Sequence, residues 1–393
     1  MHDVVVVGAG PTGCYAAREL ARLGYEVLVL EEHTEVGEPV HCTGIISLEV
    51  YRRFDLDPSC IEAYLSSARF VSPSGQSFRV NSPEARAVVV DRRRFDQLLA
   101  QQALADGASF LLGARVEGLA VTESHVVVQG HCLGEPVSFP GCLVIIATGT
   151  DESLTRQVGL EQCGGQWMFG AQLFAETGAL QEVEVHLGSA LAPGGFAWAV
   201  PANGNGCRVG LLAQERSQEL LRRFAQALEA RGAIHCNGAE IRCRAVPTGP
   251  RRPSYGDRIM VVGDAAGQVK TTTSGGIYYG LLGAEAAVQE ADRALRSGDA
   301  SARQLARYEE RWLNGIGMEQ RLGRMLRRLY ASLSDGDIEA LFWLARRARV
   351  PRALNKMPFD WHCAGLLTTL WRVLFSAEST GQTEIAATVT RDS

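Results

Sequence analysis

A glycine-rich turn between a strand and a helix, close to the N-terminus, constrains the fold of this chain more than any other feature. Val4–Val7 lead directly into Gly8-Ala9-Gly10-Pro11-Thr12-Gly13, and a second apolar strand at 26–30 follows an amphipathic helix. In such a βαβ unit the first glycine allows a tight turn, the second lets a pyrophosphate approach the backbone, and the third lets the helix pack closely on the sheet. The predicted structure is therefore a Rossmann-like unit that binds a dinucleotide through the following residues: Gly8, Gly10, Pro11, Thr12 and Gly13.

The acidic residues that end the second strand indicate which nucleotide is bound. Glu31 stands 18 positions after Gly13, and Glu32 follows it. An acidic side chain at about this distance accepts a hydrogen bond from a ribose 2′-hydroxyl. Because the carboxylate would repel a phosphorylated ribose, we expect the tightly bound nucleotide not to be NADP.

Composition and cysteine usage exclude several other classes of protein. The 393 residues are 46% hydrophobic and 21% charged, as in a soluble globular protein of two or more domains. The net charge of −5 argues against a nucleic-acid binder. The ten cysteines include no C-x-x-C pair, which predicts free thiols in a reducing compartment and no metal site. A strand begins at residue 3 and no apolar run reaches the roughly 18 residues of a membrane span, so we expect a cytoplasmic protein without a leader peptide.

The order of the predicted strands indicates a cofactor domain that is interrupted by a second domain. A buried strand near 258–262 runs into Gly263-Asp264, and we expect it in the same sheet as the N-terminal strand. The segment between them is rich in alternating strands, which predicts an inserted antiparallel sheet. Large interrupted cofactor domains of this kind are typical of FAD enzymes. The expected divisions are a cofactor domain at 1–65, 85–160 and 245–300, a β-sheet substrate domain at 66–84 and 161–244, and a C-terminal helical region at 301–393.

Further motifs resemble those of known flavoproteins. The segments 261–267 (Val-Val-Gly-Asp-Ala-Ala-Gly) and 273–277 (Thr-Ser-Gly-Gly-Ile) resemble the second FAD motif of the glutathione-reductase type. More narrowly, they resemble that of the geranylgeranyl reductase family, relatives of the p-hydroxybenzoate hydroxylase fold. Residues 92–96 resemble the family's R-x-x-F-D, 39–44 its cysteine-glycine loop, and 193–201 its P-x-x-Y-x-W-x-F-P motif. The resemblance covers about residues 1–300 and implies an α/β flavoprotein with an inserted substrate sheet.

The resemblance implies FAD as the cofactor and assigns roles to particular residues. Asp264 would accept hydrogen bonds from the ribityl hydroxyls, and Gly275 and Gly276 would bring backbone N–H groups to the flavin edge. Arg92 would contact the pyrophosphate or ribose, the alternative being a solvated charge at the end of a strand. The expected cofactor-binding residues beyond the glycine loop are Glu31, Glu32, Cys42, Thr43, Gly44, Arg92, Val116, Thr148, Gly149, Gly263, Asp264, Gly275, Gly276 and Ile277.

The same resemblance implies that reduced flavin delivers hydride to a C=C bond of an isoprenoid or similarly apolar small molecule. Cys42 would donate a proton or shape the pocket, the alternative being a buried packing residue, and His41 could relay protons. The expected substrate wall consists of Phe196, Trp198 and Pro201, the alternative being an ordinary sheet core. Phe196 replaces the tyrosine of the family motif, so an aromatic, apolar pocket is predicted without specifying a geranylgeranyl lipid.

Two other functions share this fold. The first is that of an FAD monooxygenase acting on a small aromatic or natural product. Related hydroxylases carry A-D-G where this chain has Ala147-Thr148-Gly149, and this difference counts against a monooxygenase. An electron-transfer flavoprotein serving a quinone or a protein is the second. No second G-x-G-x-x-G follows a strand, so the electron donor is left open between NAD(P)H, ferredoxin or a similar carrier.

Arginine clusters mark the C-terminal helical region. Either they close the substrate tunnel and touch an anionic membrane surface, or they form a solvated helical cap. The clusters are Arg321, Arg324, Arg327 and Arg328, then Arg346, Arg347, Arg349 and Arg352, followed by an apolar stripe at Leu366, Leu367, Leu370, Trp371, Leu374 and Phe375.

Overall fold

The computed structural model describes residues 1–160, 167–347, 350–355, 359–361, 363 and 365. The predicted apolar stripe at 366–375 and Arg349 lie outside these residues. The described helices are α1 (Pro11–Arg22), α2 (Leu48–Phe54), α3 (Arg92–Ala105), α4 (Ser153–Gln157), α5 (Ser217–Ala230), α6 (Ile277–Ser297), α7 (Ala302–Ala331), α8 (Asp335–Arg347) and α9 (Val350–Leu354), with 3-10 turns at Pro58–Cys60 and Gly263–Ala266.

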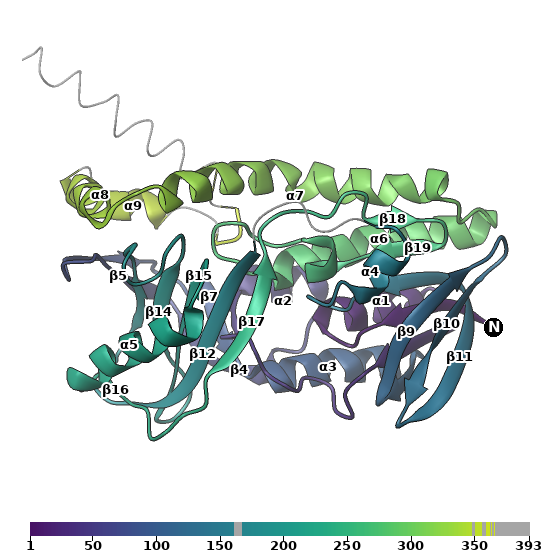
Figure 1. The fold of residues 1–393 in the computed structure, drawn as a ribbon, viewed down its shortest axis with the longest axis horizontal. Coiled ribbons are helices and arrows are strands. Elements are labelled where there is room, and N and C mark those ends of the chain that lie inside the picture. Colours follow the sequence, from purple (N-terminus) through teal and green to yellow (C-terminus); the bar gives the residue numbers. More distant parts are fainter. Residues whose placement is uncertain (161–166, 348–349, 356–358, 362, 364, 366–393) are drawn as a thin grey trace, which may run out of the picture.

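An eight-stranded sheet forms the centre of the cofactor domain. Its main path is β18 (Tyr255–Gly256), β19 (Ile259–Val261), β11 (Glu135–Ile146), β1 (His2–Val7), β2 (Val27–Glu31) and β8 (Ser109–Leu112), and β11 also pairs with β10 (Val126–Cys132), which pairs with β9 (Ala114–Val121). The strands from β19 to β8 run parallel, and the central strands β1 and β2 are buried on both faces, as a parallel sheet requires. Helices α1, α3 and α6 cover one face, and the β9–β10 ribbon and α4 cover the other (Figure 1).

This sheet joins the two ends of the cofactor domain. β19 pairs with β11, β11 pairs with β1, and the Val262 N–H donates to the Ile146 carbonyl at 2.9 Å. The strand before Gly263-Asp264 therefore lies in the same sheet as the N-terminal strand, with β11 between them. The predicted α/β fold with a Rossmann-type FAD domain is confirmed.

A second eight-stranded sheet faces the cofactor domain. Its path is β16 (Ile234–His235), β12 (Trp167–Thr177), β15 (Gly206–Ala213), β14 (Phe196–Pro201), β13 (Val183–His186), β5 (Ser67–Val71) and β6 (Ser77–Asn81), with β17 (Arg242–Pro247) beside β12. Alternate residues such as Leu173 and Val209 pack on α5. The opposite face, which includes Val200 and Trp198, packs against Val89.

A small sheet lies between the two large ones: β3 (Ile45–Ser47), β7 (Ala87–Val90) and β4 (Ile61–Leu65). Along β7, Val88 and Val90 belong to the core of the cofactor domain, whereas Val89 belongs to the core shared with the substrate sheet. Alternation of side chains along one strand thus joins both domains. The expected division of the chain at particular residues stays a prediction.

Helix α7 extends along the molecule from β18 toward the side of the substrate sheet, where α8 follows (Figure 1). Among the described residues, no helix combines the length and the apolar character that a bilayer span needs. The nine cysteines that the structure describes are all free, in agreement with the predicted thiols, while Cys163 lies outside the described residues.

Candidate active site

The glycines of the N-terminal loop meet different surroundings. A Cβ on Gly8, whose φ is +106°, would lie 2.5 Å from the Ala147 carbonyl oxygen, and a Cβ on Gly13 would lie 2.0 Å from the Gly8 oxygen. Both glycines are therefore needed for the fold itself. A Cβ on Gly10 would meet no atom within 4 Å. The backbone at Gly10 thus borders open space at the N-terminus of α1, where helical N–H groups favour an anion.

Glu31 also organises this loop. One oxygen of its carboxylate accepts a hydrogen bond from the Ala9 N–H at 2.7 Å, and the other accepts from the His33 N–H at 3.0 Å. Glu32 is exposed and pairs with Arg115 at 3.5 Å, while Val116 packs its side chain against the core of the sheet. The acidic end of β2 therefore lies beside the glycine loop, where a ribose contact requires it.

The Gly263-Asp264 segment of the second FAD motif lies against the N-terminal glycine loop. Gly263 approaches Thr12 so closely that a Cβ would lie 3.0 Å from the Thr12 hydroxyl oxygen. Asp264 follows at the end of β19, and a Cβ on Gly276 would lie 2.4 Å from its Oδ1. Within the described part of the chain, the Asp264 carboxylate has no hydrogen-bond or ion-pair partner. An unpaired acceptor at the N-terminus of α6 fits the ribityl hydroxyls of FAD, and Gly275 and Ile277 flank the same helix start.

Thr148 and Gly149 lie where β11 ends, against the glycine loop. A Cβ on Gly8 would lie 3.4 Å from the Thr148 nitrogen, and the Thr148 hydroxyl donates to the Asp151 carbonyl at 2.8 Å. Gly149 has a φ of +64°, and a Cβ there would lie 2.5 Å from Nη2 of Arg244 on β17. The structure therefore brings residues from both FAD motifs and from the end of β11 to one edge of the sheet.

The sulfur of Cys42 accepts one hydrogen bond and lies near a cation. The Gly44 N–H donates to Cys42 Sγ at 3.3 Å, and the Arg92 guanidinium is close enough for this cysteine to contribute to its raised pKa. Arg92 in turn donates to both oxygens of Asp96, at 2.9 and 3.0 Å. Burial lowers the pKa of Arg92, but the charges of Asp96 and Cys42 outweigh it and raise that pKa above its ordinary value. Arg92 is thus a buried cation beside the thiol and not a solvated charge, and its contact with FAD stays a prediction.

His41 is half-buried beside this cysteine. Burial lowers its pKa, and the nearby Arg244 and Arg242 guanidinium groups lower it further. The imidazole is therefore mainly neutral near pH 7. In the described part of the chain its Nδ1 atom has no hydrogen-bond partner, so the predicted proton relay through His41 stays a prediction.

Two polar side chains from the substrate sheet hold the same loop, and sequence reasoning missed both. Gln172 on β12 accepts a hydrogen bond from the Thr43 hydroxyl at 2.5 Å. Arg208 on β15 donates to the carbonyl oxygens of Thr43 at 2.5 Å and Val90 at 2.8 Å. The signal available in the sequence was an isolated polar residue within each apolar strand, which a buried position must satisfy with a partner.

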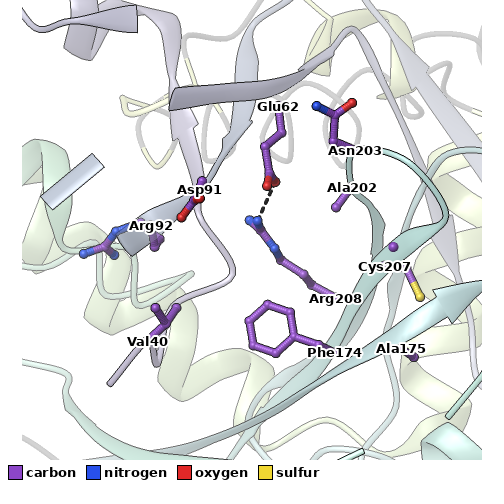
Figure 2. Close-up of a pocket in the computed structure, with 11 residues that line it drawn as sticks. Val40, Glu62, Asp91, Arg92, Phe174, Ala175, Ala202, Asn203, Cys207 and Arg208 are labelled. Atoms are coloured by element: carbon purple, nitrogen blue, oxygen red, sulfur yellow. Dashed lines mark hydrogen bonds and ion pairs between the residues drawn. The ribbon is translucent and has the colours of Figure 1, made fainter. Parts of the chain in front are cut away.

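A pocket of about 310 Å³ lies behind this loop, between Val40, the start of α3, and strands β4, β12 and β15. Figure 2 shows Arg208 reaching across it to Glu62, with Phe174 alongside and Arg92 at its border. The Arg208–Glu62 ion pair places charge on one wall of the pocket. None of the three predicted substrate-wall residues lines it.

Those residues lie on β14. Phe196 and Trp198 occupy the same face, with ring centroids 5.5 Å apart, and Pro201 ends the strand opposite Cys207. Trp198 packs with Val200 and Val89 between the substrate sheet and the small sheet. The role of these aromatics as a substrate wall stays a prediction.

The Arg327 side chain does not have the solvated or lipid-facing position that the sequence predicted. It donates to the carbonyl oxygens of Thr271 at 2.8 Å and Gly194 at 3.1 Å, and burial lowers its pKa to about 10. Arg324 is half-buried as well, whereas Arg321 and Arg328 are exposed. The arginine cluster is therefore split: Arg327 braces the segment before α6 and the turn before β14, Arg324 is half-buried, and Arg321 and Arg328 face solvent.

Comparison with known proteins identifies the class and the family of this chain. A family model described as FAD dependent oxidoreductase matches residues 3–72. Digeranylgeranylglycerophospholipid reductase 1 of Methanococcoides burtonii is 31% identical over 361 residues, 86% of each chain. Digeranylgeranylglycerophospholipid reductase 2 of Methanothermobacter thermautotrophicus is 32% identical over 364 residues, 86% of this chain and 90% of the relative.

Solved structures share the whole architecture. A geranylgeranyl bacteriochlorophyll reductase-like protein from Thermoplasma acidophilum superimposes with a TM-score of 0.84 at 23% identity, covering 96% of this chain and 98% of that one. The flavin-dependent halogenase CmlS superimposes with a TM-score of 0.68 at 19% identity, covering 94% of this chain and 76% of that one. Likenesses at these identities concern the fold alone.

The fold and the site define an FAD-dependent oxidoreductase. Its glycine loop, the open backbone at Gly10 and the unpaired Asp264 carboxylate fit that cofactor. The chain belongs to the geranylgeranyl reductase family, to which the digeranylgeranylglycerophospholipid reductases also belong.

Proposed function

We propose that this protein reduces C=C bonds in the prenyl chains of an isoprenoid lipid, with geranylgeranyl chains on a glycerophospholipid as the best-supported substrate. The observation that carries the proposal is the half-buried Cys42 sulfur, which accepts the Gly44 N–H and lies near the Arg92 cation, in a chain whose relatives are named for this reduction. FAD, once reduced, supplies the hydride. The protein must supply a proton and exclude water, because an isolated alkene is a poor hydride acceptor.

Cys42 is the proposed proton donor. The Gly44 N–H donates to its sulfur and the Arg92 guanidinium lies nearby, and both interactions strengthen when the sulfur becomes negative. They therefore favour release of the proton toward a neighbouring carbon. Asp96 keeps Arg92 in place through its two hydrogen bonds. Phe196 and Trp198 are the proposed apolar wall that keeps water away.

Turnover with a defined lipid tests the proposed function. Purified protein loaded with FAD is reduced with dithionite, mixed with a digeranylgeranyl glycerophospholipid in detergent, and the products are analysed by mass spectrometry. We expect masses that increase by two hydrogen atoms for each reduced bond. Protein without FAD is the control. Oxygen consumption with hydroxylation of a small aromatic compound, and no reduction of the lipid, would contradict the proposal in favour of a monooxygenase.

We further propose that this protein is cytoplasmic and that it reaches the lipid by binding the membrane surface with the exposed side of α7. Met325 and Leu329 are exposed there at 51% and 57%, and Arg321 and Arg328 are exposed on the same helix. Apolar side chains beside arginines on one helix suit an anionic lipid surface. Arg328 and Leu329 both stand within the last turns of the helix.

Sedimentation with liposomes of anionic phospholipid tests this contact. We expect the protein to sediment at low salt and to stay in the supernatant when salt screens the arginines, because exposed charges lose their interaction beyond the Debye length. Replacing Met325 and Leu329 with serine should lower the bound fraction severalfold. Replacing Leu23, exposed at 47% at the end of α1, with serine is the matched control. Equal binding to neutral and anionic liposomes, or no binding at low salt, would contradict the contact.

A further inference from the structure

A buried ion pair joins the loop before α6 to the C-terminal segment. The Lys270 ammonium lies 2.7 Å from the Asp360 carboxylate, and the two residues are only 8% and 3% exposed. The Phe359 ring lies beside the ammonium, which is 4.5 Å from the ring centroid. Removing two charges from water costs free energy that their mutual attraction often does not repay. Two apolar residues would serve the fold as well, so the pair indicates a role besides folding.

The position of Lys270 connects this pair to the cofactor site. Its loop belongs to the second FAD motif: the Lys270 N–H donates to the Gly275 carbonyl at 3.0 Å, and the Ser274 N–H donates to the Lys270 carbonyl at 2.7 Å. A Cβ on Gly275 would lie 3.0 Å from the Cε atom of Lys270 and 3.6 Å from its Nζ atom. The ammonium therefore lies against the backbone of Gly275, the glycine that is predicted to bring its N–H group to the flavin edge.

The positive partner of the pair is the one that lies nearer to this glycine. The three atoms nearest to a Cβ on Gly275 are Cε and Nζ of Lys270 and the Thr273 hydroxyl oxygen, and no atom of Asp360 is among them. Helix α6 begins directly after Gly276, and its N-terminal N–H groups add a positive potential at the same place. The pair and the helix therefore present the same sign of charge to whatever binds at Gly275.

Contacts from α6 and α7 fix the segment that carries the negative partner. The Tyr279 hydroxyl donates to the Asp360 carbonyl at 3.0 Å, and the Trp361 and Tyr279 rings pack with centroids 5.6 Å apart. Glu319, a second buried carboxylate, accepts a hydrogen bond from the Cys363 N–H at 2.5 Å. Charges that are held in this way act on a reaction without having to reorganise first.

We propose that Lys270 stabilises the negative charge that the flavin gains on reduction, and that the Lys270–Asp360 pair thereby sets the redox potential of the flavin. Reduction by two electrons and one proton leaves the flavin with one additional negative charge. A fixed cation beside the flavin edge favours this form over the oxidised form, and Asp360 partly compensates the cation. The inference requires only bound FAD, so it holds or fails independently of the lipid substrate.

The midpoint potential of the FAD-loaded protein tests the inference. It is measured by reduction with dithionite in the presence of a dye of known potential. We expect Lys270→Met to lower the potential by about 30 mV or more, which is a tenfold smaller ratio of reduced to oxidised flavin at a given potential. Asp360→Asn should raise the potential, because the cation then lacks compensation. Opposite shifts distinguish electrostatics from a loosened site, which would shift both variants in the same direction.

Two further variants complete the experiment. Lys270→Met/Asp360→Asn contains no unpaired buried charge, so it remains informative if a single variant unfolds, and its potential should lie between those of Lys270→Met and the wild type. Trp361→Leu is the matched control, because it loosens the same segment without changing a charge, and we expect the wild-type potential. Single variants that shift in the same direction or not at all, a double variant at the wild-type potential, or a Trp361→Leu shift as large as that of Lys270→Met would overturn the inference.

Discussion

Replacing Gly10 with alanine will give a protein that folds normally and binds FAD weakly. The added methyl group meets no protein atom within 4 Å, so the apoprotein should unfold at the wild-type temperature. It enters the space where the pyrophosphate approaches the backbone, and overpacking of this kind costs about 1–3 kcal/mol, or roughly 5- to 150-fold in affinity. The ratio of flavin to protein absorbance and a titration of apoprotein with FAD measure the loss.

Gly13→Ala is the matched comparison. Its methyl group would lie 2.0 Å from the Gly8 carbonyl oxygen, so α1 must move away from the sheet. We expect the apoprotein itself to lose several kcal/mol of stability, with a clearly lower unfolding temperature. An unstable Gly10→Ala apoprotein, or a Gly10→Ala protein with full FAD affinity, would show that the open space beside Gly10 does not receive the cofactor.

Replacing Cys42 with alanine will remove most of the turnover and leave FAD bound. Loss of a positioned proton donor lowers rates by about 10²–10⁴-fold. The side chain is small, and it accepts one backbone N–H beside Arg92, so the fold should tolerate the change. Single-turnover oxidation of the reduced flavin by a prenyl lipid measures the chemical step, and flavin absorbance confirms the FAD content. A wild-type rate in the FAD-loaded variant would contradict the proposed role.

Variants of the Arg92–Asp96 pair distinguish a role of Arg92 beside Cys42 from a role in stabilising the fold. Arg92→Met leaves the buried Asp96 carboxylate without its cation, which costs about 3–5 kcal/mol. The double variant Arg92→Met/Asp96→Leu removes both charges, and we expect it to recover most of that stability. Its reduction rate should stay low, because Cys42 has lost the neighbouring cation. Recovery of both stability and rate in the double variant would mean that Arg92 only stabilises the fold.

Local motifs made much of the cofactor site predictable. Gly8, Gly10 and Gly13 act within one strand-turn-helix unit, so their spacing alone predicts a phosphate-binding backbone. Asp264 and Gly276 belong to a second continuous motif, and they meet in space as that motif implies. Arg327 shows the limit of such reasoning. Helical periodicity placed it beside an exposed arginine face, but its donors are taken by two backbone carbonyls from other parts of the chain.

By itself, the sequence determined the class of this protein: a Rossmann-type FAD enzyme with an inserted sheet, because each motif acts through neighbouring residues. Only the tertiary structure decided what surrounds Cys42. Arg92 comes from the start of α3, while Gln172 and Arg208 come from strands that lie more than a hundred residues after Cys42 in the chain. Register between strands and packing between sheets bring these groups together, and the spacing of residues along the chain predicts neither of them.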